Sequence, residues 1–386
     1  MNDRSFYIRN VILLISINIL AKVLLVSTVS YITPQDAIHF IHLDGTDWQR
    51  NWHALNITSD NRPLADKLGY TFDSLWFVNI AHNGYVYDKS MSILFPPSKS
   101  YCMYIFPPLY PLFIKGFSFF LGYVLAGLLV SNLASIIAVI LFYTTALNYL
   151  DSNSAFRAAI LFSLYPHNLV FWTLSFSDSL YTVFLLLSWI FLDSGKLISA
   201  GFFMMLSSFT RLPGMVLFPL LSVVYVIKRP SSMRVWRLVL GISCLGLFAM
   251  PMLYWMFLQV KTETGNTLYD IRSLCSGDSL LSGLPGLFSQ SLFGLLFTYF
   301  AILGVYYLKD VDRTLQIYSM GFMFFYIVFS HPTLGVVIPR YIGTIWPLFI
   351  YYGKKLGSTD VCFYSVVFFA IASLIVILQV NQVSAI

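Results

Sequence analysis

The chain has 386 residues, of which 58% are hydrophobic, 18% are aromatic and only 10% are charged, with a net charge of +6 and a mean hydropathy of +0.75. Soluble globular proteins carry about 25% charged residues, so this composition excludes a soluble fold. Long apolar runs recur along the whole chain, which predicts an all-α, polytopic membrane protein that forms a single domain over residues 1–386. No run of lysines and arginines indicates nucleic-acid binding.

The first apolar run, Val11 to Val29, follows Arg4 and Arg9 and is long enough to cross a membrane. No small-residue cleavage site follows it, so we expect a retained first helix with a cytosolic N-terminus. The long polar segment at 34–101 then lies on the opposite, non-cytosolic side, because the positively charged flank stays in the cytosol. This segment contains a single glycosylation sequon at Asn56.

Further apolar segments are expected at 104–122, 123–149, 157–173, 177–192, 198–210, 212–227, 235–258, 287–308, 314–330, 335–352 and 360–380. Several are shorter than the roughly 20 residues that one crossing needs, so we predict about nine to eleven spanning or half-spanning helices. The basic or polar connections at 150–157, 192–196, 228–237, 309–313 and 353–355 are expected to be cytosolic.

The stretch "FTRLPG" (209–214) lies between two of the shortest apolar segments, at 198–210 and 212–227. Both outer ends of this pair are expected in the cytosol, yet only about 30 apolar residues separate them, which is too few for two straight crossings. A bent or re-entrant pair of helices with Arg211 at its turn would return the chain to the cytosolic side without two full crossings. Irregular backbone at membrane depth is tolerated next to a cavity, so Arg211 is predicted near one on the non-cytosolic side.

A short helix is predicted from Ser74 to His82, because its apolar residues recur at spacings of three and four. Asp73 stands at its N-cap position and Asn83-Gly84 provides a C-cap signal. The helix is too short to span and is rich in aromatic residues, so we expect it in the plane of the membrane interface. Asp73 is either only a cap or also a general base, and an inverting glycosyl transfer needs a single base.

Several stretches of the sequence resemble those of a known family. The stretches that carry the resemblance are "FDSLWFVNIAHNGYVYD" (72–88), "YIFPPLYPLF" (104–113), "LFSLYPHNLVFWTLSFSDSLYTVFLLLSWIFL" (161–192), "SSFTRLPGMVLFPLL" (207–221) and "HPTLGVVIPRYIGTIWPLF" (331–349). Together they resemble, in the same order, the signatures of the GPI mannosyltransferase 2 family. Two departures are that Phe72 replaces a tryptophan and Asp178 replaces a glutamate.

The resemblance implies a GT-C-type membrane glycosyltransferase with a long lumenal first loop and an active site in the lumen of the endoplasmic reticulum. The implied donor is dolichyl-phosphate mannose. The implied acceptor is a glycolipid, the one-mannose precursor of the GPI anchor, which receives a second mannose in α1,6 linkage. The catalytic aspartate of the family corresponds to Asp73. An accessory membrane subunit is left open.

Arg211 and Arg340 lie in or beside apolar runs, where charges are costly. They either snorkel or form an ion pair within the membrane, or they bind the phosphate of the lipid donor, since arginine offers two parallel donors to phosphate oxygens. Asp178 lies at a turn between two apolar runs and either caps the following helix or binds an acceptor hydroxyl or ammonium.

The remaining candidates for substrate binding are aromatic or histidine residues near the same segments: Trp76, His82, Tyr87 and His331. The histidines are either structural or orient the donor phosphate or sugar. A monophosphate leaving group does not require a metal, and we expect neither metal nor cofactor. Cys102 and Cys275 lie in polar connections and either pair or stay free.

Three other functions are alternatives to a GPI mannosyltransferase. A lipid or solute transporter would also use broken helices and intramembrane arginine, but it would show two matched halves, which are not evident here. A transferase of another sugar from a polyprenyl-phosphate donor would share the chemistry. A non-catalytic subunit of a glycosyltransferase complex is disfavoured by the intact Asp73.

Overall fold

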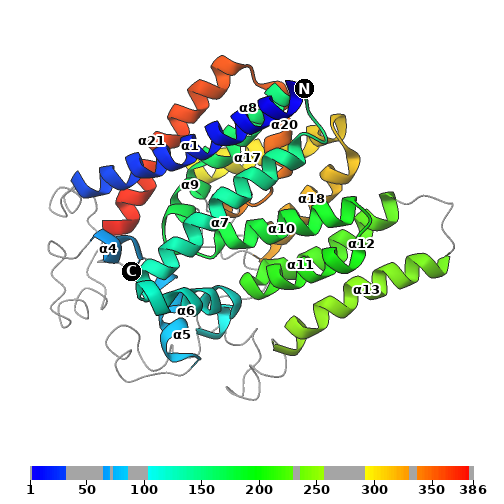
Figure 1. Ribbon diagram of the computed structural model, residues 1–386. Helices are drawn as coiled ribbons and strands as arrows, with labels where there is room; N and C mark the ends of the chain where they lie inside the picture. The colour runs from blue at the N-terminus through cyan, green and yellow to red at the C-terminus, as the bar shows by residue number, and fades with distance from the viewer. Residues whose placement is uncertain are drawn as a thin grey trace.

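The computed structural model describes residues 2–31, 64–69, 73–85, 103–228, 235–255, 292–329 and 337–381. Every regular element among them is a helix, so the predicted all-α architecture is confirmed (Figure 1). The expected sequon at Asn56, the cysteines Cys102 and Cys275, and most of the polar segment 34–101 lie outside the described residues.

The helices are α1 (Asn2–Tyr31), α4 (Leu64–Gly69), α5 (Ser74–Asn83), α6 (Leu109–Leu121), α7 (Tyr123–Ala146), α8 (Ser152–Leu164), α9 (Pro166–Thr173), α10 (Asp178–Asp193), α11 (Leu197–Thr210), the 3-10 helix η3 (Leu212–Val216), α12 (Leu217–Lys228), α13 (Val235–Tyr254), α17 (Leu292–Tyr307), η5 (Leu308–Asp310), α18 (Arg313–Phe329), α19 (Val337–Ile342), α20 (Pro347–Lys355) and α21 (Ser358–Asn381).

Three stretches of the described chain are long and apolar enough to cross a membrane: Arg4–Thr28 in α1, Tyr123–Ala146 in α7 and Ser358–Val376 in α21. Helices α9 and α10 are bent by 115° at the break between them, and a fourth crossing results if the two form one broken span. The chain is therefore a multi-pass membrane protein. Helix α6 has only 13 residues and follows a proline-rich start, so it is shorter than the roughly 20 residues that one crossing needs.

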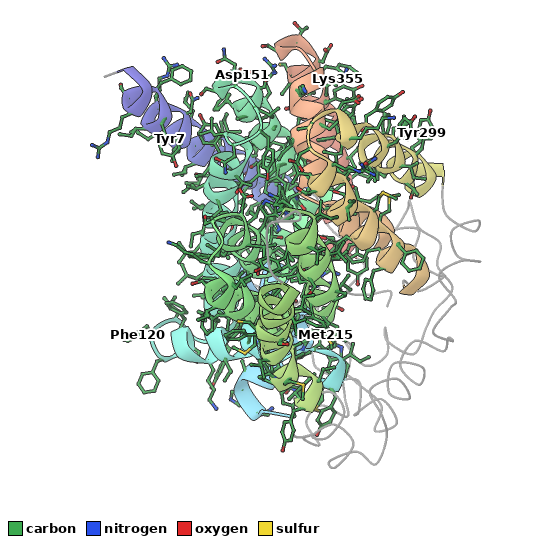
Figure 2. All side chains as sticks on the ribbon, turned by 90° about the vertical axis from the view of Figure 1, so that its right-hand side faces the viewer. Tyr7, Phe120, Asp151, Met215, Tyr299 and Lys355 are labelled. Atoms are coloured by element: carbon green, nitrogen blue, oxygen red, sulfur yellow. The ribbon has the colours of Figure 1, made fainter. Side chains whose placement is uncertain are left out.

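The start of α1 and two of the connections that were predicted to be cytosolic, at Asp151 and Lys355, lie at one end of the molecule. In Figure 2, Tyr7, Asp151 and Lys355 lie near one end, whereas Phe120 and Met215 lie near the other. Because Met215 belongs to the 3-10 turn that follows Arg211, this turn is at the end opposite to the basic connections. The turn and the basic connections thus lie at opposite ends, as the expected topology requires.

Hydrogen bonds join these connections to one another. Arg157 Nε donates to the carbonyl oxygen of Gly353 at 3.3 Å, and Lys354 Nζ donates to that of Asp310 at 3.1 Å. Lys228, at the end of α12, forms an ion pair with Asp193, at the end of α10. Each of these contacts joins two connections that lie far apart in the sequence.

The predicted turn at Arg211 is confirmed. Helix α11 ends at Thr210, Arg211 has an extended backbone (φ −150°, ψ 139°), and η3 and α12 then lead back toward the polar end. The turn is tight, because a Cβ atom added at Gly214 would lie 2.6 Å from the backbone carbon of Ser207. Glycine at this position therefore permits the close approach that directs Arg211 into the bundle.

The two-ended arrangement predicts the result of cysteine labelling. In a chain whose native cysteines are replaced, Lys355→Cys and Met215→Cys should react with a membrane-impermeant maleimide from opposite sides of the membrane. Asp151→Cys serves as the control, since it should react from the same side as Lys355→Cys. Labelling of Met215→Cys and Lys355→Cys from one side would contradict the arrangement.

Candidate active site

The carboxylate of Asp178 lies between two arginines. Asp178 begins α10, directly after the break that separates α9 from α10, and only 4% of its side chain is exposed. Arg340 donates from Nε to Oδ1 at 3.0 Å and from Nη2 to Oδ2 at 2.7 Å, and Arg211 Nη1 also donates to Oδ2. The planar guanidinium of Arg340 thus binds the carboxylate with two parallel hydrogen bonds, which fixes its orientation.

Arg340 also reaches a second carboxylate. Its Nη1 lies 3.3 Å from Oδ2 of Asp73, which precedes α5. The Asp73 side chain is 37% exposed, whereas that of Arg340 is 11% exposed. The four residues Asp73, Asp178, Arg211 and Arg340 form one ion cluster with one open and one buried carboxylate, and their formal charges sum to zero.

Aromatic rings surround the guanidinium groups. The central carbon of the Arg340 guanidinium lies 4.0 Å from the ring centroid of Phe171 and 4.9 Å from that of Phe176. That of Arg211 lies 5.7 Å from the ring centroid of Tyr341. A cation near an aromatic face is attracted by the ring quadrupole, and this attraction partly offsets the loss of water.

Asp73 occupies the predicted N-cap position of α5, but its side chain does not cap the helix. Asp73 has a helical backbone (φ −59°, ψ −21°), and its side chain accepts no hydrogen bond from the amides of α5. A capping residue normally has an extended backbone, as Asp151 has before α8 (φ −64°, ψ 161°), where its carboxylate accepts bonds from the next turn. The Asp73 carboxylate therefore faces Arg340 instead of the end of its own helix.

The expected end of α5 is confirmed, because Gly84 has a positive φ of 73° and its amide donates to the carbonyl oxygen of Ile80 at 2.9 Å. Asp178 likewise does not cap α10 in the expected way. Both of its carboxylate oxygens accept hydrogen bonds from arginines, and its binding of an acceptor hydroxyl or ammonium stays a prediction.

The proline-rich segment that precedes α6 holds α5 in place. The ring of Phe77 packs edge-on against Phe106, at a centroid distance of 5.2 Å, and against Tyr110, at 5.0 Å. The Tyr85 hydroxyl donates to the carbonyl oxygen of Phe106. Burial raises the pKa of this hydroxyl, so Tyr85 stays protonated and acts as a donor. These contacts fix the start of α5 and with it Asp73.

The other predicted substrate-binding residues are not part of the ion cluster. Trp76 stacks on Phe106 at a centroid distance of 5.9 Å. His82 shares a hydrogen bond of 2.6 Å between its Nδ1 and Oδ1 of Asn83, and its ring packs edge-on against Tyr123. Tyr87 and His331 lie outside the described residues. Their roles in substrate binding stay predictions.

Sequence analysis missed the aromatic and hydroxyl residues around the arginines. The Tyr341 ring is nearly parallel to that of Tyr326, with the centroids 4.4 Å apart. The Tyr326 hydroxyl lies 2.9 Å from Oγ1 of Thr344 and 3.4 Å from the hydroxyl of Tyr181. In a chain with 25 tyrosines and 35 phenylalanines, no local pattern distinguishes these few rings from those that face lipid.

The cluster leaves a small set of groups available for chemistry. Asp73 Oδ1 accepts no hydrogen bond from the residues that the structure describes, and Arg340 Nη1 is the only nitrogen of that guanidinium that Asp178 does not bind. The described residues contain no group of three histidine, cysteine or acidic side chains suited to a metal ion. The expectation that no metal takes part stays a prediction. An open carboxylate beside a fixed cation suits proton transfer next to an anion.

Removing the buried carboxylate should destabilise the protein strongly. Asp178→Ala leaves Arg211 without its carboxylate and Arg340 with only the longer contact to Asp73, and we expect it to lower the free energy of unfolding by about 3–5 kcal/mol. The control is Asp193→Ala, which breaks the more exposed pair with Lys228 and should cost about 0–1 kcal/mol. Unfolding in mixed detergent micelles measures both free energies. Equal losses for the two variants would contradict the conclusion that the buried arginines need Asp178.

Comparison with solved structures finds proteins that are similar to this chain. Crystal structures of ArnT from Cupriavidus metallidurans, one bound to undecaprenyl phosphate and one in the apo state, are similar at 14% and 16% sequence identity, each with a TM-score of 0.47. The matches cover 68% and 75% of this chain but only 52% and 56% of those chains, so the chain spans about half of their length. A search of curated proteins finds no match.

The family model described as Mannosyltransferase (PIG-V) matches residues 15–258, which is more than half of the chain. The matched range contains Asp73, Asp178 and Arg211, whereas Arg340 lies beyond it and joins them only in the folded structure. The chain therefore belongs to the mannosyltransferase (PIG-V) family of membrane glycosyltransferases.

Proposed function

We propose that this protein transfers mannose from dolichyl-phosphate mannose to the one-mannose precursor of the GPI anchor. The product carries a second mannose in α1,6 linkage, and the reaction takes place on the lumenal face of the endoplasmic reticulum. The observation that carries the proposal is the open carboxylate of Asp73, 3.3 Å from the buried guanidinium of Arg340. Acceptor and compartment follow from the resemblance of the sequence motifs.

In this mechanism Asp73 is the general base. The acceptor hydroxyl oxygen forms a bond to the anomeric carbon of mannose while the bond from that carbon to the phosphate oxygen breaks. The electron pair leaves with the phosphate, the configuration inverts, and the hydroxyl proton passes to Asp73. Among the described residues no arginine binds its Oδ1, so this oxygen is taken as the acceptor of the proton.

Arg340 stabilises the leaving phosphate, with Arg211 beside it. Charge develops on the phosphate as the sugar leaves, and a positioned cation lowers the energy of that state. At the same moment the proton neutralises Asp73, so the total charge of the site does not change. Asp178 binds both arginines throughout, which fixes their guanidinium groups and leaves Nη1 of Arg340 beside Asp73.

Analysis of lipid-linked glycans after loss of the protein tests the acceptor. Accumulation of a GPI precursor with one mannose supports the proposal. An unchanged GPI pathway, together with transfer of another sugar from a polyprenyl-phosphate donor by the purified protein, would instead favour a transferase of a different glycan. A panel of polyprenyl-phosphate sugars offered to the same preparation distinguishes the two.

The base is tested by Asp73→Asn. Asparagine keeps the size of the side chain and its hydrogen bond from Arg340, but it cannot take the proton, so turnover should fall about 10²-fold or more. Folding and membrane insertion should stay normal, because Asp73 is not a helix cap. Turnover is measured as mannose transfer by the purified protein.

The matched control is Asp151→Asn at the opposite end of the molecule. Asp151 is a true cap, and asparagine caps a helix about as well as aspartate, so this variant should keep both stability and activity. An Asp73→Asn protein that transfers mannose as fast as the wild type would remove Asp73 from the reaction.

The role of Arg340 is tested by Arg340→Lys. Lysine keeps the charge and can still pair with Asp178, but a single ammonium cannot reproduce the three directed contacts of Arg340. We expect the protein to fold and its kcat to fall about 10²-fold, since a donor to the developing charge is lost. Arg157→Lys, which changes an arginine at the opposite end, should have normal kcat. Equal activity of both variants would contradict the assignment.

A further inference from the structure

A lysine is buried in the first membrane-spanning helix. Lys22 belongs to α1 and is 7% exposed. Its ammonium donates to Oδ1 of Asn132 at 2.9 Å, to the carbonyl oxygen of Trp172 at 3.2 Å and to Oγ of Ser135. These three bonds use all the donors of the ammonium group, and no carboxylate among the described residues pairs with it.

The partners of Lys22 show what its charge balances. Trp172 is the last but one residue of α9, so its carbonyl oxygen is one of those that the helix itself leaves without a donor. The carbonyl end of a helix carries a partial negative charge, which a cation stabilises. A charge within a membrane span is costly and needs such a partner, so Lys22 and the end of α9 depend on each other.

Helix α7 holds the same helix end from a second side. Asn132 Nδ2 donates to the carbonyl oxygen of Thr173 at 3.1 Å, and Ser131 Oγ donates to that of Trp172 at 3.3 Å. Ser179, in the first turn of α10, donates to the carbonyl oxygen of Ser131 at 2.8 Å. Hydrogen bonds therefore run from α1 through α7 to both sides of the break between α9 and α10.

This break carries part of the ion cluster. Phe171 lies just before the break and Phe176 within it, and both rings contact the guanidinium of Arg340. Asp178, which follows the break, binds Arg340 with two hydrogen bonds. A shift of the carbonyl end of α9 would move these three groups and would turn Arg340 relative to Asp73.

We propose that Lys22 is a positioning residue for the active site. Its ammonium holds the carbonyl end of α9 against α7 and thereby fixes the rings and the carboxylate that orient Arg340. It touches neither substrate nor the reacting atoms. The inference rests on the proposed function, because it takes the ion cluster to be the reacting site.

The test compares Lys22→Met with Asn18→Leu in the full-length protein in lipid nanodiscs, with dolichyl-phosphate mannose as donor. Asn18 lies one turn earlier on α1 and donates to Ser163 of α8 at 2.8 Å, so its loss breaks a buried polar link that does not involve α9. Lys22→Met should lower kcat per folded molecule about 10–100-fold, the effect of a displacement of about 1 Å in a positioned group. Asn18→Leu should leave kcat per folded molecule near that of the wild type.

A double-mutant cycle with Arg340→Lys separates positioning from a purely structural role. If Lys22 acts through Arg340, Lys22→Met should cost much less activity in the Arg340→Lys protein than in the wild type. An equal fold-loss in both backgrounds, or a loss that only follows the folded fraction, would overturn the proposal. If Lys22→Met does not fold, Asn132→Ala removes the bonds of this side chain to Lys22 and to Thr173 while keeping the lysine, and it is judged by the same cycle. Full activity of Asp73→Asn would instead refute the proposed base, independently of this cycle.

Discussion

A carboxylate can lie deep in an apolar helical bundle only where cations neutralise it and satisfy its oxygen atoms. Asp178 meets this condition through Arg340 and Arg211, and each of the three residues lies where regular helix stops or starts. The break between α9 and α10, the turn after α11 and the short helix α19 thus converge on one point. Irregular backbone at membrane depth is tolerated only inside protein, and here it surrounds the ion cluster.

The same pairing separates the two carboxylates by role. Asp178 is buried and fully bound, so it acts as the fixed counter-ion of the arginines. Asp73 is partly exposed, and its Oδ1 has no hydrogen-bond partner among the described residues, so it is the more accessible carboxylate of the two. One guanidinium links both carboxylates: Asp178 binds two of its nitrogen atoms, and the third, Nη1, lies beside Asp73.

Polar groups elsewhere in the spans obey the same constraint. Lys22, Asn18 and Asn10 of α1 all bind partners on other helices, because the bilayer offers them no water. Lys22 binds the end of α9, which precedes the break, and Asn18 binds Ser163 of the neighbouring helix α8. The basic connections lie at the opposite end, where Lys228 pairs with Asp193 in a more exposed setting.

The sequence by itself determined the helical membrane architecture, the turn at Arg211, and the position and C-terminal end of α5. These features follow from local composition, periodicity and the single glycine at position 84, so no distant residue is needed to predict them. Only the tertiary structure decided that Asp73 faces an arginine instead of capping its helix, and that Asp178 is the bound carboxylate. The physical reason is that Arg340 lies 267 positions from Asp73 in the sequence, and a side chain's direction depends on the charge that folding brings beside it.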